Sequence, residues 1–125
     1  MALLYLFLMW AYEDSGQWDK AIDASQKASR AHPEASALKA ALQAEGSRGY
    51  WRVNESFLSK QPNPDHLRLA VCYARLGQGE QALARLEQAF QKREPESIYV
   101  KSEPAFDWMH GDPRFRKLTD ALKLP

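Results

Sequence analysis

The chain has 125 residues and a formal net charge of +1, with 45% hydrophobic and 26% charged residues. This length accommodates one domain with a continuous core. The small net charge disfavours attraction of the whole domain to nucleic acid or anionic lipid, so we expect no direct binding of nucleic acid. Cys72 is the only cysteine, which excludes an intramolecular disulfide and a thiolate zinc site and fits a cytoplasmic location.

The chain opens with the apolar run MALLYLFLMWAYEDSGQW. Its apolar part, residues 2–12, reaches at most about half of the roughly 20 residues that a membrane-spanning helix needs. A secretory signal would have a basic stretch before this part and a small-residue cleavage site after it, and neither is present. We therefore expect no membrane segment here but a buried helix over 2–15, ended by Gly16.

Helical periodicity dominates the rest of the chain, and strand signals are nearly absent. Apolar stripes predict helices over 18–32, 35–46, about 50–60 and 79–92. Asn63 as N-cap and Pro64 as first helical residue predict a further helix over 64–76. In the same way, Asp112 and Pro113 predict a short helix over about 113–122. The short joints between these helices predict antiparallel neighbours.

Two segments of the chain align with each other. They read LYLFLMWAYEDSGQWDKAIDASQKASRAHP and DHLRLAVCYARLGQGEQALARLEQAFQKREP. In this alignment Leu8, Tyr12, Gly16, Ala21 and Ala28 meet Leu69, Tyr73, Gly77, Ala82 and Ala89. The segment between them is interpreted as a degenerate middle unit, in which Gly49 and Trp51 copy Gly16 and Trp18.

This pattern resembles the tetratricopeptide repeat (TPR) family, which places small residues where two helices approach and aromatic residues between units. The resemblance implies an all-α, right-handed superhelix of about three helical hairpins with a short C-terminal capping helix. We expect a single domain over 1–125. Its parts are repeat 1 at 1–33, the degenerate repeat 2 at 34–63, repeat 3 at 64–95, and the C-terminal turn and capping helix at 96–125. The chain departs from the family pattern at Met9, Ser25 and Gly79, the last of which stands in place of the turn aromatic.

The tail carries EPAF at 103–106 and DPRF at 112–115. It looks like the C-terminal end of TPR regions in large bacterial signalling proteins. In those proteins the region follows a winged-helix DNA-binding domain, a nucleotide cyclase domain or a serine/threonine kinase domain. The resemblance implies that this segment is the C-terminal portion of a bacterial signalling or transcription-regulatory protein.

No sequence pattern in the chain supports catalysis or nucleotide binding, so we expect neither an enzyme nor a cofactor. Asp107, His110 and Asp112 could meet as metal ligands, but helix capping is the favoured interpretation. Cys72 is interpreted as a small buried hydrophobic residue. The remaining aromatic residues fit core positions better than a stacking platform for bases or carbohydrate. Trp108 is the exception, because it lies in a turn-rich stretch and is open to exposure.

In the TPR family, the first helix of each pair lines a concave face on which partners bind. Carrying the groove-facing positions over to this chain gives a candidate peptide-binding set. The set is Trp10, Glu13, Lys39, Gln43, Arg68, Cys72 and Arg75. Lys39, Arg68 and Arg75 would form a basic stripe for an acidic protein or peptide, although they could also be plain solvated positions. The residues of chaperone-binding carboxylate-clamp TPRs are not reproduced, so we do not expect chaperone binding.

The alternative to an interaction module is a self-associating structural scaffold. The apolar surface of the first helix exceeds what one partner helix can cover, whereas the terminal unit of a solenoid normally has a polar outer face. This hypothesis predicts a homodimer through the N-terminal helix. The residues that would form the contact are Leu3, Leu4, Leu6, Phe7 and Trp10.

Overall fold

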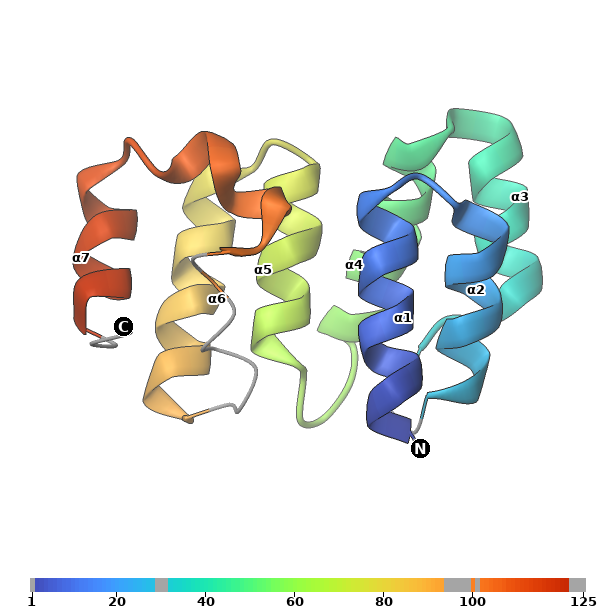
Figure 1. The fold of residues 1–125 in the computed structure, drawn as a ribbon, viewed down its shortest axis with the longest axis horizontal. Coiled ribbons are helices and arrows are strands. Elements are labelled where there is room, and N and C mark those ends of the chain that lie inside the picture. Colours follow the sequence, from blue (N-terminus) through green and yellow to red (C-terminus); the bar gives the residue numbers. More distant parts are fainter. Residues whose placement is uncertain (1, 29–31, 94–99, 101, 122–125) are drawn as a thin grey trace. The chain divides into compact units, whose positions relative to one another are not determined.

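A computed structural model describes residues 2–28, 32–93, 100 and 102–121 (Figure 1). These residues form helices and turns, with no strand among them. The chain divides into two compact units, Met1–Leu58 and Ser59–Pro125. The all-α prediction is therefore confirmed over the described residues. None of the helices described is long and apolar enough to cross a membrane.

Unit 1 contains α1 (Ala2–Asp14), α2 (Trp18–Lys27), α3 (Ala35–Glu45) and α4 (Ser47–Ser59). α1 and α2 form an antiparallel hairpin, and α2 also packs on α3 (Figure 1). The small residues Ala21 and Ala24 lie buried on α2, where they allow close helix packing. Ile22 and Leu38 complete this part of the core, each about 1% exposed.

Unit 2 contains α5 (His66–Arg75), α6 (Gly79–Gln91), the 3-10 helix η2 (Pro104–Met109) and α7 (Pro113–Ala121). α5 and α6 form an antiparallel hairpin; η2 contacts α5 and α7 contacts α6 (Figure 1). The tail contributes Phe106, Met109 and Phe115 to the core, all nearly fully buried. The rings of Phe106 and Phe115 lie 5.9 Å apart, which fixes η2 against α7. The predicted C-terminal helix is thus confirmed, with Asp112 Oδ1 accepting a hydrogen bond from the backbone N–H of Arg114 at 2.8 Å.

The two hairpins turn in the same way. In α1–α2, Gln17 N–H donates to the Tyr12 carbonyl at 2.8 Å, and in α5–α6, Gln78 N–H donates to the Tyr73 carbonyl at 2.8 Å. The glycine between helices has a positive φ in both, +75° at Gly16 and +76° at Gly77. This is the geometry of a helix that ends on a left-handed glycine. The predicted equivalence of the two segments is thus confirmed at the turns. It fails for Ala28 and Ala89, because Ala28 lies beyond the end of α2 with an extended backbone, whereas Ala89 is buried inside α6.

The middle hairpin corrects the expected repeat register. Its turn glycine is Gly46, with φ +68°, and not Gly49, which lies inside α4. The turn glycines therefore follow one another at intervals of 30 and 31 residues. Gly49 has a different role: a Cβ there would overlap the carbonyl group of Ala41, lying 2.9 Å from its carbon. The absence of a side chain at Gly49 lets the first turn of α4, which starts immediately after Gly46, approach the backbone of α3 at Ala41.

Two further predicted boundaries are wrong for local reasons. α2 ends at Lys27 rather than 32, because Ala28 has the extended conformation with ψ 151°. α5 begins at His66 rather than Pro64, because Asp65 provides the cap in place of Asn63. The Asp65 carboxylate accepts from the backbone N–H of Arg68 at 3.0 Å, which is the usual N-cap geometry.

Candidate interaction surfaces

The candidate peptide-binding residues of unit 1 fall into two groups. Lys39 and Gln43 are exposed and lie one helical turn apart on α3. Trp10 is half-buried and packs against a cluster that contains Leu6 and Met9, and Glu13 is only 4% exposed. Lys39 and Gln43 are thus open to a partner, whereas Glu13 belongs to the interior.

Glu13 lies in the interior because Tyr50 binds it. The Tyr50 hydroxyl donates a hydrogen bond to the Glu13 carboxylate, and the Tyr50 side chain is fully buried. The Tyr50 ring has Trp18 at 4.8 Å and Trp51 at 5.0 Å between ring centroids. These rings meet at tilted or edge-on angles, an arrangement typical of a packed aromatic core. The interpretation of these aromatic residues as core filler is confirmed.

Unit 1 also carries a pocket that sequence reasoning missed. It has a volume of about 590 Å³ and lies between the start of α2 and the junction of α3 with α4. Gln43 is one of its lining residues, so one of the two exposed candidate residues on α3 borders it. No sequence pattern marks the pocket, because its wall comes from two separate turns. The lining residues are Gly16, Gln17, Trp18, Asp19, Lys20, Leu42, Gln43, Gly46 and Ser47.

In unit 2 the predicted basic residues are either buried or close to a carboxylate. Arg68 is only 6% exposed, and its backbone N–H donates to Asp65. Arg75 is partly exposed, and a guanidinium nitrogen lies 3.8 Å from the carboxylate of Glu103 in the tail. Cys72 is completely buried, as expected for a small hydrophobic residue. Within unit 2, Arg68 is therefore largely withdrawn from solvent, and Arg75 lies near a carboxylate of the tail.

The candidate self-association residues are also divided. Leu4 is 51% exposed, whereas Leu6 is 3% exposed and belongs to the core cluster with Met9 and Ala24. Phe7 and Trp10 are half-buried and meet edge to face at 5.6 Å. The side chain of Leu3 lies outside the described part of the structure. Leu4 is the member of this set that is plainly exposed.

Trp108, like Leu4, is a large hydrophobic residue that is exposed, at 56%. Its indole Nε1–H donates to the carbonyl of Ala74 at 3.2 Å. One edge of its ring lies at Gly79, where an added Cβ would be 3.1 Å from the ring. The tail ring thus occupies space left by the glycine that replaces the aromatic residue expected at this turn. Two features of the sequence pointed to this contact. Gly79 stands where an aromatic residue is expected, and Trp108 lies outside the helical stripes.

An ion cluster includes Glu80, the residue that follows Gly79 in the chain. The Arg114 guanidinium donates to both carboxylate oxygens of Glu80 at 2.7 Å and pairs with Asp112 at 3.2 Å. These hydrogen bonds lower the pKa of Glu80 and of Asp112, so both carboxylates stay ionised well into the acidic range. The cluster also connects α6 to the start of α7. His110 is stacked on Phe115 with ring centroids 5.1 Å apart.

The residues weighed as metal ligands, Asp107, His110 and Asp112, therefore have other partners or positions. Asp112 caps α7 and pairs with Arg114, and His110 stacks on a core ring. Within the described ranges, no group of three or more His, Cys, Asp or Glu residues is placed to hold a metal ion.

A scan against protein families matches residues 66–97 to the tetratricopeptide repeat. The match covers α5 and α6, the hairpin whose turn has the same hydrogen bonds as α1–α2. Neither the curated proteins nor the solved structures include a match to this chain.

Proposed function

Because the chain carries a tetratricopeptide repeat at residues 66–97, we propose that it is a non-catalytic module that binds another protein. The repeat match is the observation that carries this proposal. Such repeats stack helical hairpins into a scaffold, and the exposed helix faces then serve as binding surfaces. Motifs for catalysis and for nucleotide binding are absent from the sequence.

The partner contacts the exposed side of α3 in unit 1. Lys39 and Gln43 are the accessible members of the groove-facing set, and Gln43 also borders the 590 Å³ pocket. Lys39 supplies a cation and Gln43 supplies both a donor and an acceptor for a peptide backbone. An acidic side chain of the partner lies at Lys39 in this proposal. Glu13, Arg68 and Cys72 support the fold from within rather than touching the partner.

A peptide array tests this proposal. The array holds acidic, basic and neutral peptides of equal length and is probed with labelled wild-type protein and with the double variant Lys39→Glu, Gln43→Ala. We expect acidic peptides to bind the wild type and not the α3 variant. The control is Lys117→Glu, Gln91→Ala, which makes the same changes at exposed positions of unit 2. Equal binding by wild type and the α3 variant, with circular dichroism unchanged, contradicts the proposal.

The module serves a larger cytoplasmic regulatory protein of bacteria in this proposal. The support is the tail, which resembles the end of TPR regions in such proteins through EPAF at 103–106 and DPRF at 112–115. The complete coding sequence tests it: a DNA-binding, cyclase or kinase domain ahead of this segment is the expected result. An unrelated neighbouring domain contradicts it.

Self-association through the N-terminal helix is the second candidate function. The exposed side chain of Leu4 favours it, because an isolated apolar side chain on a helix gains from burial against a second copy. Sedimentation equilibrium of the wild type and Leu4→Glu tests it. A dimer that dissociates on substitution supports self-association, and a wild-type monomer at tens of micromolar excludes it at that concentration.

A further inference from the structure

The exposed indole of Trp108 is held in place on two sides. Its Nε1–H donates to the Ala74 carbonyl, and one ring edge lies against Gly79. Both anchors belong to the end of unit 2 at which α5 turns into α6. The ring nevertheless stays 56% exposed. A ring fixed in this way offers a preformed apolar surface, and ordering it costs a partner little conformational entropy.

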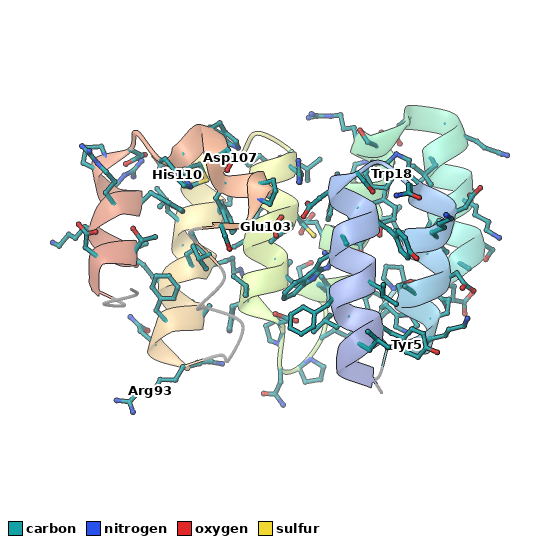
Figure 2. The ribbon with its side chains drawn as sticks, viewed as in Figure 1. Tyr5, Trp18, Arg93, Glu103, Asp107 and His110 are labelled. Carbon is teal, nitrogen blue, oxygen red and sulfur yellow. The ribbon has the colours of Figure 1, made fainter. Side chains whose placement is uncertain are left out.

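The charges around this ring are mainly negative. Asp107 precedes Trp108 in the chain and is exposed, and Figure 2 shows it at the end of unit 2 where α5 turns into α6. Glu80 follows Gly79, the residue that the ring touches, and Asp112 lies four residues beyond the ring. Glu80 and Asp112 share the single guanidinium of Arg114. The residues that flank the indole and its contact at Gly79 in the chain thus include three carboxylates, of which Glu80 and Asp112 pair with Arg114.

Two further titratable groups of the described tail, Glu103 and His110, have partners of their own. Glu103, which caps η2, pairs with Arg75 at 3.8 Å, so these two groups compensate each other. His110, exposed on the same segment, has its ring stacked on Phe115 rather than over Trp108. An acidic partner would meet net repulsion at this surface, whereas a cation would find attraction.

We propose that Trp108, with Asp107 and Glu80 at its rim, is a second interaction surface that binds a basic segment of a protein partner. A lysine or arginine side chain lies over the exposed indole face, and the neighbouring carboxylates complete its charge pairing. Tryptophan is the strongest aromatic acceptor for such a contact, and Arg and Trp are common anchors of interfaces. This surface is independent of the proposed acidic-partner face on α3, because it lies in unit 2 and prefers the opposite charge.

Nuclear magnetic resonance with a defined probe tests the surface. An arginine–glycine repeat peptide is titrated into the ¹⁵N-labelled full chain. A glutamate–glycine peptide of the same length is the control of opposite charge. The indole Nε1–H signal of Trp108 is assigned from its disappearance in Trp108→Phe. We expect the arginine peptide to shift this signal in a saturable, salt-sensitive way and the glutamate peptide to leave it unchanged.

Charge variants separate binding from folding. Asp107→Lys leaves the indole and its hydrogen bond to Ala74 in place. We expect this substitution to weaken binding of the arginine peptide by about five-fold or more. Asp120→Lys makes the same change at an exposed position of α7 and should bind like the wild type apart from a small long-range effect. The proposal is overturned if the Trp108 signal does not respond, if both peptides shift it equally, or if the two variants weaken binding equally.

Discussion

Gly49 illustrates how a single absent side chain decides the packing of an element. It lies within α4, where alanine would ordinarily be the better helix former by about 1 kcal/mol. The backbone of Ala41 on α3 nevertheless leaves no space for a Cβ at this position. The usual preference for alanine in a helix is therefore reversed here.

We predict that Gly49→Ala destabilises the protein by about 1–3 kcal/mol, the usual cost of forcing extra volume into a packed contact. Urea unfolding followed by circular dichroism measures the change. Gly111→Ala is the matched control, because nothing lies within 4 Å of a Cβ there. An alanine at position 49 that leaves stability equal to or above that of the wild type would show that α3 and α4 are less closely packed.

His66 makes stability depend on pH. Its side chain is buried, and Nδ1 lies 3.0 Å from a guanidinium nitrogen of Arg85, which can only donate. Desolvation, with the charges of Lys92 and Arg85 as smaller contributions, lowers the pKa of His66; Asp65 opposes them. The folded imidazole therefore remains neutral at a pH at which the unfolded one, with a pKa of about 6.5, already takes up a proton.

Because the unfolded state binds this proton first, stability is complete above about pH 6.5 and falls as the pH drops below it, towards the lowered folded pKa. We predict that the urea midpoint decreases between about pH 7.5 and pH 5 and that His66→Gln reduces this decrease. The comparison is made at constant ionic strength on wild type and variant. Equal pH dependence in the two proteins would assign the effect to other groups.

At the scale of single elements, the start of α5 shows a competition between two caps. The sequence pattern predicted Asn63 as the cap with Pro64 as the first helical residue, but Asp65 has a side chain of the same capping type. In the structure Asp65 captures the Arg68 N–H, and the helix begins at His66. A local pattern could not decide between them, since each side chain can accept from the backbone N–H groups two or three residues after it.

We predict that Asp65→Ala lowers the free energy of unfolding by about 1 kcal/mol, as expected for loss of an N-cap. Asn63→Ala should leave the free energy of unfolding equal to that of the wild type within experimental error, because Asn63 is exposed and lies before the cap residue Asp65. Thermal unfolding of both variants checks this pair. A larger loss of stability in Asn63→Ala than in Asp65→Ala would identify Asn63 as the cap instead.

The contact between Trp108 and Gly79 shows that local patterns also fail to predict how two elements meet. The sequence reveals a missing aromatic residue at 79 and an unassigned tryptophan 29 positions later, but no periodicity connects them. Only the fold brings η2 onto α5 and places the ring at Gly79. The basic-segment surface proposed above depends on this contact, and so could not have been predicted from either position alone.

At the scale of the whole molecule, each unit has its own buried residues. Ile22, Leu38 and Tyr50 are nearly fully buried in unit 1, as are Leu86, Phe106 and Phe115 in unit 2. Helices and turns account for all of the secondary structure described. We predict a far-ultraviolet circular dichroism spectrum typical of a helical protein. A substantial strand contribution would contradict the fold.

The sequence by itself determined the helical class, the antiparallel hairpins and the equivalence of the turn between α1 and α2 with the turn between α5 and α6. These follow from short-range causes: apolar spacing, small residues on the packed faces, and turn glycines that adopt a positive φ. It also identified Trp108 as an aromatic residue outside the helical stripes.

Tertiary structure alone decided which of the candidate residues are accessible. Lys39 and Gln43 remain open, whereas Tyr50 draws Glu13 into the core and Glu103 approaches Arg75 from the tail. The pocket near α3 likewise exists only because two distant turns meet. Helical spacing fixes which face of its own helix a side chain occupies, but exposure depends on what another part of the chain places over that face.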